Sequence, residues 1–268
     1  MRYILNPYIA LRSWMLVPYA YYIKGERNAK GLTAEEFAFL TECDGRSELP
    51  DEAESPLARK FLADGFIRRA ESSDVLSDWS RPRLCPNRYF PAMNWMITGK
   101  CNYNCIHCFN AADNAPLMSE WSMDEADRLL DQARDCGINA FTITGGEPML
   151  HPRFFEMAEY ASRLGFVVGL TTNGTLITGD TAERIVRSGI RSVSVSMDGE
   201  EHSHDMLRAV PGAFERAASG IRELTEYSRG KVSVQITTVF HKMNLDQFND
   251  MLGLAEKLGV SAWRPINV

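Results

Sequence analysis

The chain has 268 residues, 45% hydrophobic and 24% charged, proportions typical of a soluble protein with one large or two smaller domains. Its net charge of −6 argues against a nucleic-acid partner, because a surface that follows phosphates needs a basic excess. No apolar run approaches the ~18 residues of a membrane-spanning helix, and no secretory signal opens the chain. We therefore expect a cytoplasmic protein without a membrane partner.

Residues 1–70 are predicted to form a small α+β domain. Residues 8–23 are rich in Tyr, Ile, Val and Trp, which favours two short strands. A helix is expected to start at Thr33, where Thr33 and Glu36 form a capping box, and to stop at Gly45. A second helix is expected in SPLARKFLADG and a closing strand in FIRRA. This order of elements favours a winged-helix-like domain.

The charge of residues 1–70 weighs against the DNA-binding role that a winged helix suggests. Ten Lys or Arg residues are balanced by ten Asp or Glu residues, whereas a phosphate-binding face needs a basic excess. A protein or peptide partner is favoured, and a packing domain without a ligand stays open. Residues 71–90 are polar, contain Pro82 and Pro86, and show neither helical nor strand periodicity, which predicts a linker.

From residue 91 to residue 268 the chain alternates between strand and helix patterns. Such alternation predicts an α/β fold with a parallel sheet, and six strands with five helices fit a partial (β/α)6 TIM-like barrel. The expected strands are AMNWMIT, AFTIT, FVVGLTT, SVSVSM, VSVQITTVF and SAWRPINV. The expected helices are residues 122–136, 152–164, 180–188, 213–229 and 245–258.

Capping signals mark the ends of these helices. Ser122 with Glu125, and Asn244 with Gln247, have the spacing of capping boxes. Glycines stand where left-handed residues after helices are expected, at positions 137, 165, 189 and 259. The last strand ends at Val268 without the helix that would cover it, so we expect the natural protein to continue past this residue.

Half of the six cysteines lie close together, at Cys101, Cys105 and Cys108, just after the first expected strand. TGGEP follows the second strand, TTNGT the third and SMDGE the fourth. Because the carboxyl ends of parallel strands meet at one edge of a sheet, these four loops are expected to converge. Three neighbouring thiols indicate a metal site, and their spacing alone leaves zinc and an iron–sulfur cluster open.

The C-x3-C-x2-C loop together with the Gly-Gly-Glu-Pro loop resembles the radical S-adenosylmethionine (AdoMet, or SAM) enzymes over residues 91–268. The resemblance implies a [4Fe–4S] cluster held by the three cysteines, with AdoMet on the fourth iron. It also implies reductive cleavage of AdoMet to methionine and a 5′-deoxyadenosyl radical, which abstracts hydrogen from a substrate. A flavodoxin- or ferredoxin-type protein is the implied electron donor.

The resemblance also assigns residues to AdoMet. The loop of Gly145, Gly146, Glu147 and Pro148 is expected to bind the amino group of AdoMet. Ser196 and Arg208 are expected to hold its methionyl carboxylate. Asn173 is expected near the ribose and Phe109 near the adenine. A helix-capping Ser, a surface Arg and a core-anchoring Phe are the alternatives, and no catalytic acid or base is identified.

Three histidines are expected to play no part in binding metal. His107 stands where these enzymes usually have another aromatic residue, a variant that resembles the SPASM-type branch of peptide maturases. Its ring is expected to cover the cluster without ligating it. His202 and His204 lie in a segment similar to a mainly structural one in this branch, so they are not expected to be metal ligands.

The leading prediction is a peptide maturase in which residues 1–70 bind the leader of a ribosomally made precursor peptide. The leader would add to the domain as an edge strand. One alternative is a radical SAM enzyme that acts on a haem precursor or another small cofactor precursor. The other alternative is a non-catalytic iron–sulfur or zinc protein.

Overall fold

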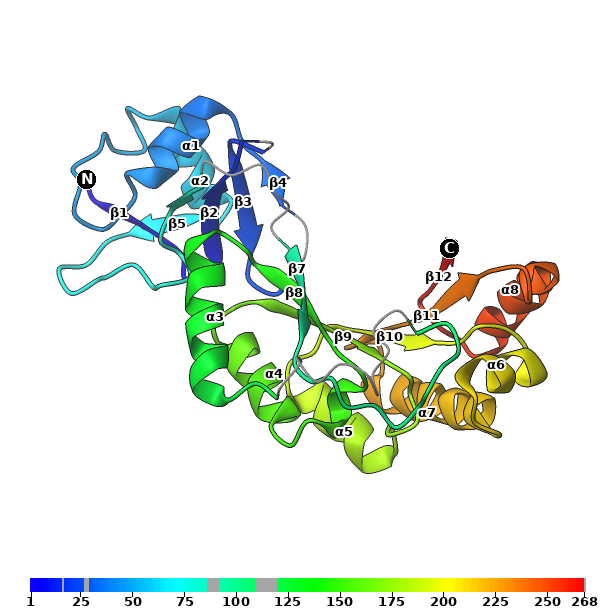
Figure 1. The fold of residues 1–268 in the computed structure, drawn as a ribbon. Helices are drawn as coiled ribbons and strands as arrows, with labels where there is room; N and C mark the ends of the chain where they lie inside the picture. The colour runs from blue at the N-terminus through cyan, green and yellow to red at the C-terminus, as the bar shows by residue number, and fades with distance from the viewer. Residues whose placement is uncertain (16, 27–28, 86–91, 109–119, 268) are drawn as a thin grey trace. The chain divides into compact units, whose positions relative to one another are not determined.

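The computed structural model describes residues 1–15, 17–26, 29–85, 92–108 and 120–267 (Figure 1). Its contacts divide the chain into two compact units. The first unit comprises Met1–Ala92, Leu130–Asn139 and Leu164–Phe166, and the second Met93–Leu129, Ala140–Arg163 and Val167–Val268. Within the described ranges, no helix is both long enough and apolar enough to cross a membrane.

Between Met1 and Ala92, the described residues of the first unit form two small sheets and two short helices. A two-stranded antiparallel sheet pairs β1 (Tyr3–Leu5) with β5 (Ile67–Arg69). The second sheet has the order β4 (Lys30–Gly31), β3 (Ala20–Ile23), β2 (Ile9–Ser13) and β6 (Arg83–Leu84). The helices are α1 (Ala34–Thr41) and α2 (Pro56–Ala63). This arrangement does not confirm a winged helix, which stays a prediction for residues 1–70.

Local signals place the helices of the first unit. Thr33 Oγ1 accepts the backbone N–H of Glu36 at 3.1 Å, and the Glu36 carboxylate accepts that of Thr33 at 2.8 Å. The predicted capping box is therefore confirmed. Both helices bury apolar side chains against the strands in one core, which includes Leu11, Phe37 and Phe61.

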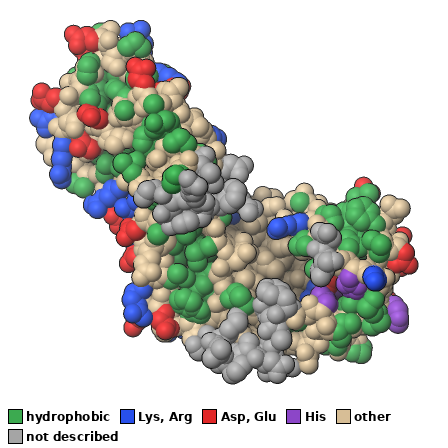
Figure 2. Space-filling view, turned by 45° about the horizontal axis from the view of Figure 1, so that its top comes forward, with side chains coloured by type: hydrophobic (Ala, Val, Ile, Leu, Met, Phe, Trp, Pro, Cys, Tyr) green, Lys and Arg blue, Asp and Glu red, His purple; other side chains and the backbone are tan. Residues whose placement is uncertain are grey.

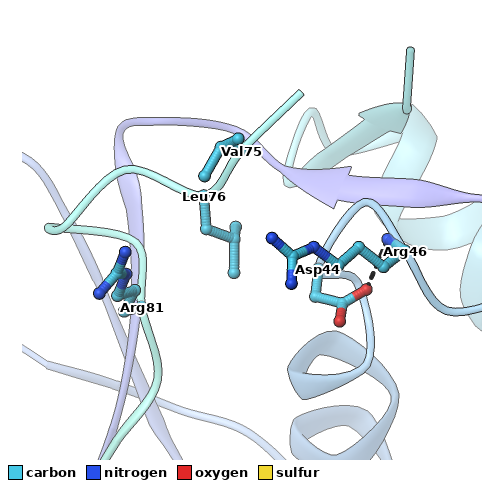
Figure 3. Close-up of a pocket in the computed structure, with 5 residues that line it drawn as sticks. All are labelled: Asp44, Arg46, Val75, Leu76 and Arg81. Atoms are coloured by element: carbon cyan, nitrogen blue, oxygen red, sulfur yellow. Dashed lines mark hydrogen bonds between the residues drawn. The ribbon is translucent and has the colours of Figure 1, made fainter. Parts of the chain in front are cut away.

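A cavity of about 250 Å³ opens on the first unit (Figure 3). It lies between the turn after α1, which carries Asp44 and Arg46, and the segment that carries Val75, Leu76 and Arg81. Asp44 accepts the backbone N–H of Arg46 at 2.7 Å. Among the described residues, the lining of this cavity includes no thiol or imidazole.

The second unit is built on a six-stranded sheet with the order β12-β11-β10-β9-β8-β7, and the pairings from β8 to β12 are parallel. The predicted partial barrel is confirmed. The strands are β7 (Ala92–Met96), β8 (Ala140–Thr144), β9 (Val167–Thr172), β10 (Ser192–Ser196), β11 (Ser233–Phe240) and β12 (Ala262–Asn267).

Helices follow the strands, and Figure 1 shows α4, α5 and α7 along one side of the sheet. The helices are α3 (Met123–Asp135), α4 (Phe154–Arg163), α5 (Gly179–Arg187), α6 (Glu201–Arg208), α7 (Ala213–Ser228) and α8 (Phe248–Lys257), with 3-10 turns η2 (Pro148–Leu150) and η3 (Leu245–Gln247). The glycines at 137, 165, 189 and 259 all have positive φ, as predicted.

Two features of the second unit differ from expectation. Helix α6 forms in a segment for which the sequence patterns predict no helix. The Asn244 side chain does not cap η3; instead it accepts the N–H of His241 and donates to the carbonyls of Asp198 and Val239. The capping box at Ser122 and Glu125 does form, with the two reciprocal hydrogen bonds of 2.9 and 3.3 Å.

Candidate active site

A cavity of about 420 Å³ lies at the carboxyl ends of the strands of the second unit. Strands β8 to β12 all contribute a residue from their last two positions. These residues are Thr144, Thr171, Thr172, Ser196, Val239 and Ile266. The remaining lining comes from the loops that follow the strands and from α6, so a binding site forms where a parallel α/β sheet is expected to have one.

The three cysteines of the first loop line this cavity, and all three are free thiols. Burial raises the pKa of the thiols of Cys101 and Cys105 above its ordinary value. Ionisation of either thiol therefore needs positive charge beside it, which an iron cluster would supply. Among the described residues, no three His, Cys, Asp or Glu side chains gather tightly enough for a single metal ion.

Gly145 and Gly146 follow β8, and they let the Gly-Gly-Glu-Pro loop approach the start of the cysteine loop. Gly146 N–H donates to the carbonyl of Thr98 at 2.9 Å, and Glu147 N–H donates to that of Lys100 at 2.7 Å. A Cβ at Gly145 would lie 2.4 Å from the Thr98 oxygen, and one at Gly146 would lie 2.2 Å from the Lys100 oxygen. Only glycine therefore fits at either position, and both glycines line the cavity.

Glu147 and Pro148, which complete this loop, are buried and are not among the described residues that line the cavity. The Glu147 carboxylate is fully buried and accepts hydrogen bonds from Thr172 Oγ1 and Asn173 N–H, both at 2.8 Å. Burial raises its pKa to about 6, although these hydrogen bonds oppose the rise. Glu147 thus joins the loop after β8 to the loop after β9.

Asn173, Ser196 and Arg208 also face the cavity. The Asn173 amide donates to Asn102 Oδ1 at 2.8 Å, which joins the loop after β9 to the cysteine loop. Arg208 is 9% exposed, and its Nη1 lies 3.6 Å from Cys105 Sγ. Its Nε is buried without a hydrogen-bond partner among the described residues, so this guanidinium keeps a donor for a ligand.

His107 lines the cavity, and its ring centroid lies 6.1 Å from that of His241. Figure 2 shows histidine side chains gathered beside hydrophobic ones at one end of the second unit. His204 is buried, and its Nδ1 accepts the N–H of Asp198 at 3.0 Å, so it has a structural contact. Phe109 falls outside the described residues, and its predicted place near adenine stays a prediction.

Sequence reasoning missed several residues of the site. Thr144, Thr171, Val239 and Ile266 could have been found from their positions at strand ends. Tyr103 could have been found only as a neighbour of the cysteines. Asp198 contacts both His107 and Arg208 without lining the cavity, and no signal in SMDGE distinguished it.

The residues present fit a [4Fe–4S] cluster and AdoMet. Three thiols leave one iron of such a cluster without a protein ligand. Beside them lie a loop that a Cβ would obstruct, the hydroxyl of Ser196 and a buried guanidinium with an unused donor. These groups suit the amino and carboxylate groups of an amino acid ligand.

The chain is similar to several curated synthases. It is 37% identical to the AdoMet-dependent heme synthase of Methanosarcina barkeri over 63% of this chain and 48% of that protein. It is 30% identical to the pre-heme d1 synthase of Dinoroseobacter shibae over 73% of this chain and 48% of that protein. The chain therefore spans about half the length of the curated relatives it matches.

The fold is that of Streptococcus suis SuiB, whose crystal structure with S-adenosylmethionine aligns with a TM-score of 0.70. The alignment covers 99% of this chain and 63% of SuiB, at 16% sequence identity. The family model described as "Radical SAM superfamily" matches residues 95–255, which is more than half of the chain. The chain therefore belongs to the radical SAM superfamily of enzymes, whose cofactors are a [4Fe–4S] cluster and AdoMet.

Proposed function

We propose that this protein cleaves AdoMet reductively and abstracts a hydrogen atom from a haem precursor. The observation that carries the chemistry is the convergence of three thiols, two obligatory glycines and Arg208 on one cavity. The substrate class rests on the similarity to two synthases of haem-type cofactors. This alternative has more support than the peptide substrate that was the leading prediction.

The residues of the cavity have distinct roles in this proposal. Cys101, Cys105 and Cys108 hold the cluster. The backbone of Gly145 and Gly146 faces the AdoMet amino group, while Ser196 and Arg208 hold its carboxylate and Asn173 lies toward the ribose. When bound, the two cofactors supply a 5′-deoxyadenosyl radical, and the protein orients them and excludes water. A flavodoxin- or ferredoxin-type protein is the proposed electron donor.

The first test asks whether the protein cleaves AdoMet. The chain is reconstituted with iron and sulfide under anaerobic conditions, reduced with dithionite, and assayed for 5′-deoxyadenosine by mass spectrometry. Wild type should form it, and Cys105→Ala should not. Cys136→Ala is the matched control, because Cys136 is also a free thiol but does not line the cavity. Cleavage by Cys105→Ala at the wild-type rate would refute the proposal.

The second test concerns the substrate. Coproporphyrin III and its iron complex are added to the reduced enzyme with AdoMet, and products are followed by mass spectrometry. We expect substrate-dependent 5′-deoxyadenosine and a tetrapyrrole product with altered mass. Cleavage of AdoMet that no tetrapyrrole stimulates would remove the haem-precursor assignment while leaving the radical chemistry intact.

A precursor peptide remains the second candidate, because one observation favours it. The alignment with SuiB includes the first unit, and SuiB has also been solved bound to its precursor peptide SuiA. In this alternative, residues 1–70 bind the leader of such a peptide. A complex of the full chain with a leader peptide encoded beside it, measured by calorimetry, would support the peptide over the tetrapyrrole.

A further inference from the structure

Asp198 lies two residues beyond the end of β10 and has no exposed surface. Its backbone is held on both sides, since its N–H donates to His204 Nδ1 at 3.0 Å and its carbonyl accepts from Asn244 Nδ2 at 2.9 Å. These contacts come from α6 and from the turn after β11. The position of its carboxylate is therefore set by the fold before any ligand binds.

The carboxylate of Asp198 contacts three other segments of the second unit. Oδ1 accepts the backbone N–H of Val239 in β11 at 2.9 Å. Oδ2 accepts Nη2 of Arg208 at 2.5 Å and lies 3.3 Å from Nε2 of His107. Burial raises the pKa of Asp198, but the charge of Arg208 and the hydrogen bonds from His107 and Val239 outweigh it and lower the pKa to about 2. The carboxylate is therefore ionised.

Arg208 connects this carboxylate to the cysteine loop. Its Nη2 binds Asp198 while its Nη1 lies 3.6 Å from Cys105 Sγ. The preceding residue, Leu207, accepts the N–H of Ile106 at 3.0 Å, so the end of α6 is also joined to that loop through the backbone. One buried carboxylate thus orients the cation that lies beside a cluster cysteine and offsets its charge.

We propose that Asp198 is a positioning residue, which holds Arg208 beside the cysteine loop and contacts His107 within that loop, and thereby sets AdoMet affinity and the reduction potential of the cluster. This inference rests on the proposed placement of the two cofactors. Outer partners of this kind orient the groups that bind a metal or its ligand, and their loss commonly costs about 10- to 100-fold. The potential of an iron–sulfur cluster also follows the net charge around it.

The variant Asp198→Asn tests this proposal because it removes the charge and keeps the shape. An amide nitrogen facing Arg208 would set donor against donor and leave the guanidinium charge uncompensated. We expect a full complement of iron, an AdoMet Kd raised by about 10- to 100-fold, and a cluster potential shifted in the positive direction. The measurements are anaerobic calorimetry and a redox titration followed by electron paramagnetic resonance.

Asp205→Asn is the matched control, since it makes the same change on α6. Asp205 accepts the backbone N–H groups of Gly212 and Phe214 and does not line the cavity. This control should keep the wild-type Kd and potential. An Asp198→Asn protein with wild-type Kd and potential would overturn the proposal, whereas a wild type that takes up no cluster would instead refute the proposed function.

A double-mutant cycle identifies the route through which Asp198 acts. If it acts through Arg208, Asp198→Asn should raise the AdoMet Kd in the wild-type background and have no further effect in an Arg208→Gln background. Effects that multiply would overturn the proposed route.

Asp198→Glu provides a second test, because it keeps the charge but displaces the carboxylate. We expect weaker AdoMet binding with the wild-type potential, and wild-type binding would contradict a positioning role.

Discussion

Replacing Gly146 with alanine should destabilise the protein and impair its active site together. The added Cβ would lie 2.2 Å from the carbonyl oxygen of Lys100, whereas real Cβ contacts stay above 3.0 Å. The neighbouring atom is backbone, so rotation of a side chain cannot relieve this overlap. The loop after β8 must therefore move by roughly 1 Å relative to the cysteine loop to restore ordinary contact.

That movement would strain two short hydrogen bonds. Gly146 N–H to Thr98 is 2.9 Å long and Glu147 N–H to Lys100 is 2.7 Å. Overpacking costs about 1–3 kcal/mol and each of the two weakened hydrogen bonds about 1 kcal/mol, so we expect a loss of about 3–5 kcal/mol in the free energy of unfolding. A displacement of 1 Å at the cofactor loop can also cost about 100-fold in rate.

Urea unfolding followed by circular dichroism measures the first effect, and 5′-deoxyadenosine formation the second. Gly253→Ala is the matched control, because Gly253 lies inside α8 and an added Cβ there meets nothing within 4 Å. That variant should gain about 0.5–1 kcal/mol. A Gly146→Ala protein with wild-type stability and AdoMet cleavage would refute the argument that the two loops require this close approach.

Three further predictions concern other residues. Burial chiefly lowers the pKa of His204 from 6.5 to about 4. Its neutral form therefore contributes stability that is fully present above pH 6.5 and is lost as the pH falls through about 4. From pH 6.5 to pH 4, the free energy of unfolding, measured with urea, should fall by about 3 kcal/mol more in wild type than in His204→Asn. An equal fall in both proteins would contradict the assignment. Arg12→Lys should lower the free energy of unfolding, measured by thermal unfolding, by about 3 kcal/mol. The buried Arg12 donates to three backbone carbonyls, and lysine cannot reproduce its planar guanidinium. Unchanged stability would contradict this reasoning. Ile266→Glu should leave AdoMet binding intact and abolish substrate-stimulated cleavage, because Ile266 lines the cavity, whereas Leu252→Glu on α8 should affect neither.

The alternating architecture could be predicted because its signals are local. Strand and helix periods, the capping boxes at Thr33 and Ser122, and the glycines after helices each require only a few neighbouring residues. The resemblance that named most of the cavity residues likewise rested on two short motifs at strand ends. The local periodicity and the two motifs can both be read without knowing which distant residues they contact in the fold.

Other features could not be predicted because their determinants are distant in the sequence. Helix α6 has no side-chain cap at its start and ends on Ala209 in a left-handed conformation, so it lacks both usual boundary signals. Asn244 has the spacing of a cap, but its amide instead binds the carbonyl of Asp198, 46 residues away. At Asn244, a tertiary partner therefore outweighed the local preference for a helix cap.

The size of the cavity limits where a substrate can bind. Its volume of about 420 Å³ lies near the lower end of the ~300–1,000 Å³ that small-molecule sites span. The cysteines, the glycine pair and Arg208 occupy much of its wall, and these groups suit the cofactors. A tetrapyrrole or a peptide must then approach across the rim, where Val239 and Ile266 stand at the ends of β11 and β12. Residues that determine substrate specificity should therefore lie at this rim. Substitutions there should weaken substrate binding and leave the cleavage of AdoMet unchanged.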